Sequence, residues 1–161
     1  MLLDFDGVVN ALRYSDSDPV GWGDYARELL HLDGFGFVVC FSPSLVGVIN
    51  RWEHELVDVV WLTTWFGSTS EFSKLGFDEF LAIGLDEGSG VDFGEWKAEV
   101  GANFIETSDY KKVVWVDDDV YVNGFNLFVE RLGKEFLRVN PVDSVGLSPS
   151  EVCLIKEFLA T

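Results

Sequence analysis

Short, mostly apolar segments alternate along this chain with segments of helical periodicity, and this alternation constrains the fold more than any other feature. The apolar segments have the length of strands that are buried on both faces. They lie at Met1–Phe5, Val57–Leu62, Val113–Val116 and Phe136–Val139. Strands that alternate with helices predict a parallel sheet covered by helices on both faces. We therefore expect an α/β fold with a three-layer, Rossmann-like arrangement.

The helices between these strands are marked by apolar periodicity and by capping residues. The predicted helices are a segment from Leu45 to Trp52, a short helix started by a Ser68–Glu71 capping box, a helical segment at Glu95–Val100, the segment Phe125–Leu132 with Gly133 as its C-cap, and a final helix started by Ser148-Pro149-Ser150-Glu151. The final helix is expected to bury Val152, Ile155, Phe158 and Leu159.

Residues 8–40, which follow the first strand, allow two interpretations. The spacing of the apolar residues between 22 and 29 fits one face of a helix. The runs Leu30–Leu32 and Phe35–Phe41, joined by Asp33-Gly34, instead fit a hairpin, because an Asp-Gly pair between β-prone runs is a common hairpin turn. We favour the hairpin and expect residues 8–40 to form a small flap insertion.

The intervals between the polar strand ends leave no room for a large cap domain. The interval from Asp6 to Thr63 is filled by the hairpin, a strand and one helix, and the interval from Thr63 to Lys97 is shorter still. Residues 76–94 are punctuated by acidic residues and glycines, so they predict a loop with one short strand at Phe80–Leu85. Any site at the sheet edge should therefore be rather open.

The length and charge of the chain limit its class of function. A chain of 161 residues fits one domain, residues 1–161, and its net charge of −17 repels nucleic-acid backbones and anionic membranes. No basic run marks an extended nucleic-acid surface, and no apolar run approaches the roughly 20 residues of a membrane span. With no visible signal peptide, we expect a cytoplasmic protein in which Cys40 and Cys153 are buried free thiols, although one disulfide remains an alternative.

Three predicted strands end in polar residues that could meet. Asp4 and Asp6 follow the first strand, Thr63 and Thr64 follow another, and Asp117–Asp119 follow a third. The carboxyl ends of parallel strands lie at one edge of the sheet, which is where such folds bind ligands. An isolated pair such as Asp4 and Asp6 is more often an acidic turn, so the pair gains weight only from these other strand ends.

These segments resemble the motifs of the haloacid dehalogenase superfamily of phosphotransferases. The matching residues are Leu2–Val8, Val60–Thr64, Lys97 and Val114–Asp118, and they occur in the order of the family's motifs. Each motif is weak alone, but four in order at strand ends are fairly specific. Within the superfamily, the chain is similar to small domains that are fused in RNA-repair proteins and stand alone in phages and actinobacteria.

The resemblance implies roles for four of these residues. Asp4 would be the nucleophile that forms an aspartyl-phosphate, and Asp6 would be the general acid and then the general base. Thr63 would hydrogen-bond a phosphoryl oxygen, although Thr64 could take its place. Lys97 would offset charge at the phosphoryl group and hold the nucleophile. Lysines 74, 111 and 112 compete with Lys97 for this role.

The resemblance also implies a Mg²⁺ site. Its ligands would be Asp4, the backbone carbonyl of Asp6, and Asp117, with Asp118 as a second or outer ligand. Asp119 is expected to face solvent. Mg²⁺ suits such a site because it prefers hard oxygen ligands, and it would offset the repulsion between a carboxylate nucleophile and an anionic phosphate ester.

The expected function is a Mg²⁺-dependent phosphatase or phosphotransferase acting on a phosphate monoester. The substrate would be a phosphorylated small molecule, a nucleotide or a nucleic-acid end, and Trp65 would be a candidate surface for stacking a ring. The alternative is a catalytically inert module of the same fold that binds a metal or a partner, such as a phage accessory protein. His31 and His54 lie far from every motif and are expected to be surface residues.

Overall fold

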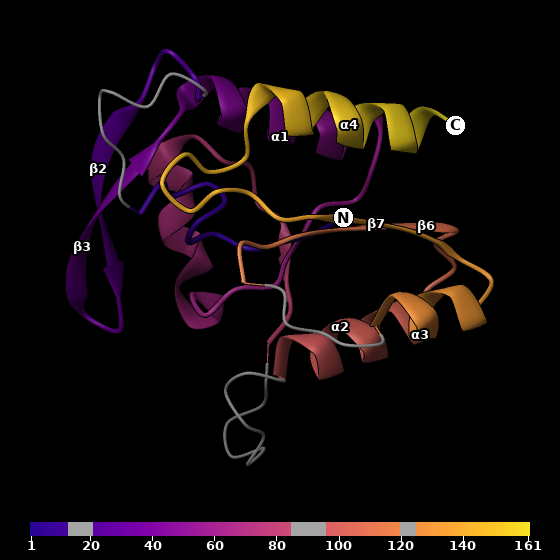
Figure 1. Ribbon diagram of the computed structural model, residues 1–161. Coiled ribbons are helices and arrows are strands. Elements are labelled where there is room, and N and C mark those ends of the chain that lie inside the picture. Colours follow the sequence, from indigo (N-terminus) through magenta and orange to yellow (C-terminus); the bar gives the residue numbers. More distant parts are fainter. Residues whose placement is uncertain (13–20, 85–95, 120–124) are drawn as a thin grey trace.

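The central element of the protein is a five-stranded parallel sheet (Figure 1). The computed structural model describes residues 1–12, 21–84, 96–119 and 125–161. The strands, in spatial order, are β5 (Leu81–Ala82), β4 (Val60–Trp61), β1 (Leu2–Leu3), β6 (Lys112–Val116) and β7 (Glu135–Val139). The first strand in sequence is thus the middle strand of the sheet. The predicted strands are all present, although the ladders of β1 and β4 are shorter than the apolar runs that predicted them.

Helices cover both faces of this sheet, as the strand–helix alternation predicted. Helices α1 (Pro43–Glu55) and α4 (Pro149–Ala160) lie on one face, and α2 (Trp96–Glu106) and α3 (Phe125–Arg131) lie on the other (Figure 1). The core is divided accordingly, because successive strand residues point to opposite faces. Leu3 packs in the cluster that includes residues of α1 and α4, whereas Leu2 packs in the cluster that includes residues of α2 and α3.

A two-stranded hairpin follows the first strand and confirms the favoured interpretation of this segment. Strands β2 (Ala26–Leu32) and β3 (Phe35–Phe41) pair antiparallel, and the turn between them has positive φ at both Asp33 and Gly34. These angles match the twist of the flanking strands. The helical alternative fails because β2 begins at Ala26, earlier than predicted. Residues 13–20 of the predicted flap lie outside the described part of the chain.

The predicted capping box at Ser68 and Glu71 is wrong. The segment is a 3₁₀ helix, η1 (Phe66–Leu75), which has no side-chain cap, and Ser68 has non-helical backbone angles inside it. The carboxylate of Glu71 accepts a hydrogen bond from the backbone N–H of His31 and pairs with Lys74. Glu71 therefore ties η1 to the hairpin instead of capping its own helix.

The second capping box forms as predicted, but the burial expected around it is only partly right. The Ser148 hydroxyl accepts from the backbone N–H of Glu151, whose carboxylate accepts from the N–H of Ser148. Of the four residues expected to be buried in α4, only Ile155 is fully buried. Cys153 is exposed, which corrects the prediction of a buried thiol, whereas Cys40 is buried; neither cysteine is in a disulfide. No helix in the described ranges is long and apolar enough to cross a membrane.

Candidate functional site

Three carboxylates converge at the carboxyl edge of the sheet. Asp4 follows β1, while Asp117 and Asp118 follow the neighbouring strand β6. One oxygen of each carboxylate lies within 4.8 Å of the others. Asp4 is 5% exposed and Asp117 is 1% exposed, so two of the three charges are removed from water. Burial of like charges at this spacing is costly unless a cation offsets them.

Lys97 supplies one such cation from the first turn of α2. Its Nζ lies 2.6 Å from Oδ2 of Asp4 and 2.8 Å from Oδ2 of Asp117. Burial disfavours the ammonium, but the two carboxylates outweigh burial and raise the pKa of Lys97 above its usual value. The competing lysines are engaged or exposed elsewhere: Lys74 pairs with Glu71, Lys112 donates to the carbonyl oxygen of Phe158, and Lys111 is exposed.

One positive charge is not enough for the cluster. Burial is the largest influence on Asp4, and together with repulsion from Asp117 it raises the pKa of Asp4 to about 7 against the attraction of Lys97. Burial, followed by repulsion from Asp117, likewise raises the pKa of Asp118 to about 6. Oδ1 of Asp4 is buried and has no hydrogen-bond partner among the described residues. A divalent cation fits this set of three convergent carboxylates because it would neutralise the remaining charge.

Gly7 allows Asp118 to approach the loop after β1. Gly7 has a φ of +68°, and a Cβ at this position would lie 2.1 Å from Cγ of Asp118. No larger residue fits there, and the positive φ also favours glycine. Asn140, just after β7, donates from Nδ2 to the carbonyl oxygens of Asp117 and Asp118 at 3.0 and 2.6 Å. Asn140 is not among the predicted site residues, although its place directly after a predicted strand is a signal that points to it.

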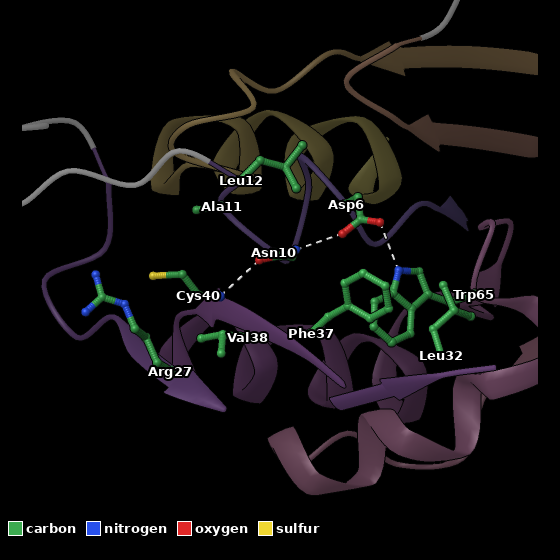
Figure 2. Close-up of a pocket in the computed structure, with 10 residues that line it drawn as sticks. All are labelled: Asp6, Asn10, Ala11, Leu12, Arg27, Leu32, Phe37, Val38, Cys40 and Trp65. Carbon is green, nitrogen blue, oxygen red and sulfur yellow. Dashed lines mark hydrogen bonds between the residues drawn. The ribbon is translucent and has the colours of Figure 1, made fainter. Parts of the chain in front are cut away.

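Asp6 is not part of the carboxylate group. Its Oδ1 accepts from Nδ2 of Asn10 at 2.7 Å and its Oδ2 accepts from Nε1 of Trp65 at 2.8 Å (Figure 2). Asn10 in turn accepts from the backbone N–H of Cys40 in β3 at 2.9 Å. Trp65 is only 2% exposed and its ring packs edge-on against Phe37, so the predicted stacking surface is wrong. The indole N–H orients Asp6 instead.

The two threonines after β4 differ in exposure. Thr63 is buried beside the carboxyl edge of the sheet, whereas Thr64 is exposed. Asp119 is exposed as expected, and its backbone N–H donates to Oδ1 of Asp117 at 3.0 Å. Oγ1 of Thr63 accepts a hydrogen bond from the backbone N–H of Trp65 at 3.4 Å, and the role of either threonine at the site stays a prediction.

No protein-family model, curated protein or solved structure matches this chain. Of the predicted site residues, Asp4, Lys97, Asp117 and Asp118 come together in one cluster, and Asp6 lies outside it with separate hydrogen-bond partners. An acidic group that could hold a metal ion is the firm result.

A pocket of about 480 Å³ lies between the loop after β1 and the hairpin (Figure 2). Asp6 and Asn10 line it from the loop, while Arg27 and Phe37 line it from the hairpin. This volume is within the range of small-molecule sites. The carboxylate that the resemblance assigns to proton transfer thus borders a space that can hold an organic group.

Proposed function

We propose that this protein is a Mg²⁺-dependent phosphatase of the haloacid dehalogenase type, acting through an aspartyl-phosphate on Asp4. The observation that supports this most is the asymmetry of the Asp4 carboxylate. Oδ2 is held by Lys97 at 2.6 Å, whereas Oδ1 is buried at the cluster without a hydrogen-bond partner in the described residues. A carboxylate fixed by one oxygen and free at the other is suited to nucleophilic attack.

The residues of the cluster have complementary tasks in this reaction. Oδ1 of Asp4 forms a bond to phosphorus as the bond from phosphorus to the leaving oxygen breaks. Lys97, which already bridges Asp4 and Asp117, offsets the negative charge of the phosphoryl oxygens, and the buried Thr63 donates a hydrogen bond to one of them. When bound, Mg²⁺ would be held by Asp4, Asp117 and Asp118 and would neutralise charge on the transferring group.

Asp6 would move the protons. Its position outside the cluster, at the border of the pocket, leaves it free of metal coordination through its side chain. It would protonate the leaving oxygen in the first step and take a proton from water in the second, when water attacks phosphorus and releases Asp4. The donors from Asn10 and Trp65 fix the orientation of its two oxygens.

The substrate would be a phosphate monoester, such as a phosphorylated small molecule, a nucleotide or a nucleic-acid end. No large cap covers the carboxyl edge in the described part of the chain, so a bulky leaving group is sterically compatible. The net charge of −17 disfavours contact with a long polynucleotide.

Phosphate release from para-nitrophenyl phosphate tests the proposal. Release should require Mg²⁺, stop in EDTA and be abolished by Asp4→Asn. The matched control is Asp119→Asn, which removes an exposed carboxylate near the cluster and should leave release unchanged. Undiminished turnover in Asp4→Asn would contradict the mechanism. Mg²⁺ binding without turnover on a broad panel of phosphate esters would instead favour the inert metal-binding module.

A further inference from the structure

The pocket beside Asp6 has a chemical character that the phosphoryl-transfer site does not explain. Much of its lining is apolar and comes from Leu12, Leu32, Phe37 and Val38. Leu12, Phe37 and Val38 are each at least 45% exposed, so these side chains present an uncovered apolar surface. Such a surface next to a reacting group favours a flat or aliphatic organic moiety.

Arg27 gives the same pocket a positive charge. Among the described residues of the lining it is the one cation, and Figure 2 shows it at the end away from Asp6. Its guanidinium makes no hydrogen bond or ion pair with any residue in ranges 1–12, 21–84, 96–119 and 125–161. In a chain with 28 acidic residues against 11 basic ones, an arginine facing a pocket without a carboxylate partner is available to an anion.

We infer that this pocket binds the leaving group of the phosphate ester and selects one that carries a second anionic group. The inference rests on the proposed function. Asp6 must reach the leaving oxygen to protonate it, so the leaving group extends from Asp6 into the adjacent space. Its apolar part would lie along Phe37 and Val38, and its anion, a carboxylate or a further phosphate, would meet Arg27.

The charge of the chain explains why Arg27 would determine specificity for the leaving group. The negative field of this chain repels a doubly anionic substrate unless a local cation offsets the repulsion. A guanidinium can donate two parallel hydrogen bonds to the two oxygens of a carboxylate or a phosphate. A neutral amide has only one acceptor oxygen and cannot accept this pair of bonds. Arg27 should therefore distinguish an anionic leaving group from its neutral isostere.

Matched aryl phosphates test this subsite. Para-carboxyphenyl phosphate is compared with para-carbamoylphenyl phosphate, and a longer pair carries the carboxylate or the amide on an ethyl spacer. We expect kcat/KM for the acid to exceed that for the amide by about tenfold or more in at least one pair, which is the effect of one charged hydrogen bond. Arg27→Gln should remove this preference, so that kcat/KM becomes similar for the acid and the amide of each pair.

The control is Arg51→Gln, which removes an exposed arginine from α1, outside the pocket, and should keep the preference. A phosphonate in place of the carboxylate identifies the preferred anion. If Arg27→Gln lowers kcat/KM more for the phosphonate than for the carboxylate, the pocket selects a second phosphate. If Arg27→Gln lowers it less, the pocket selects a carboxylate. An acid-to-amide ratio that Arg27→Gln leaves unchanged in both pairs would overturn the subsite alone. No turnover of any ester, para-nitrophenyl phosphate included, would overturn the proposed function and the subsite with it.

Discussion

Replacing Asp4 by asparagine should stabilise the cation-free protein at pH 8 and about half as much at pH 5. The reason is the buried charge of Asp4, whose pKa is about 7 in the folded protein against an ordinary value of 3.8. Between these values the folded state keeps a proton that the unfolded state releases. The free energy of unfolding of the wild type therefore falls as pH rises through this range, whereas the neutral amide of asparagine escapes the loss.

The size of the effect follows from the shift. Each pKa unit corresponds to about 1.4 kcal/mol, so Asp4 costs the fold about 4 kcal/mol at pH 8, where its carboxylate is charged, and about 2 kcal/mol at pH 5, where it must hold a proton. The stability of Asp4→Asn relative to the wild type should thus increase by about 2 kcal/mol between the two conditions. Attraction to Lys97 is already contained in this pKa.

Urea unfolding in EDTA at both pH values measures this difference. Asp119→Asn is the control, because it makes the same substitution at an exposed carboxylate beside the cluster and removes no buried charge. Adding Mg²⁺ at pH 8 should reverse the order by stabilising the wild type by about 1.4 kcal/mol for each tenfold excess of free Mg²⁺ over the dissociation constant. The buried-charge explanation would be refuted if the difference in the free energy of unfolding between Asp4→Asn and the wild type stayed constant or shrank from pH 5 to pH 8.

Three further substitutions test the surroundings of Asp4. Gly7→Ala should lose about 1–2 kcal/mol of stability from the positive φ, and it should also lose Mg²⁺ affinity in calorimetry because its Cβ would displace Asp118. Trp65→Phe removes a donor to Asp6, so kcat should fall about ten- to a hundredfold for alkyl phosphates and much less for para-nitrophenyl phosphate, whose leaving group needs no proton. Lys97→Met leaves two buried carboxylates without their cation, so urea unfolding at pH 8 should show a loss of about 3–5 kcal/mol, which Mg²⁺ restores in part without restoring turnover.

Each of these substitutions has a matched control in the chain. Gly133→Ala has the same backbone strain, with a φ of +71°, but open space around its Cβ, so it should lose stability without losing Mg²⁺ affinity. Trp61→Phe changes a buried indole of the hydrophobic core that also contains Trp65, and the indole N–H that donates to Asp6 is that of Trp65. Lys111→Met removes an exposed lysine. Equal effects in a variant and its control would show that general stability, not the site, was measured.

The sequence was sufficient to predict the scaffold because apolar runs report burial directly. The run that precedes Asp4 and the run that precedes Asp117 became adjacent parallel strands, and parallel strands end at one edge of a sheet. The convergence of these carboxylates therefore needed only the order and the polarity of the segments. The hairpin was predictable for the same local reason, since Asp33-Gly34 has the turn chemistry that a tight hairpin requires.

Contacts between distant segments could not be predicted in the same way. Glu71 matches a capping box locally, but a backbone N–H of the hairpin competes for its carboxylate and prevails. The partners of Asp6 are a nearby Asn10 and the distant Trp65, and no periodicity in the sequence links them. The predicted loop at 85–94 and the start of the helix at Glu95 lie outside the described residues.

The most direct test of the central claim is to identify the phosphorylated residue. The Asp6→Asn variant, which lacks the base for the second step, is mixed with para-nitrophenyl phosphate and Mg²⁺, quenched in acid, and its peptides are examined by mass spectrometry. The proposed mechanism predicts one phosphoryl group on Asp4, absent when EDTA is present. Release of phosphate by the wild type, with no phosphoryl group on Asp4 or with one on a different residue, would contradict it.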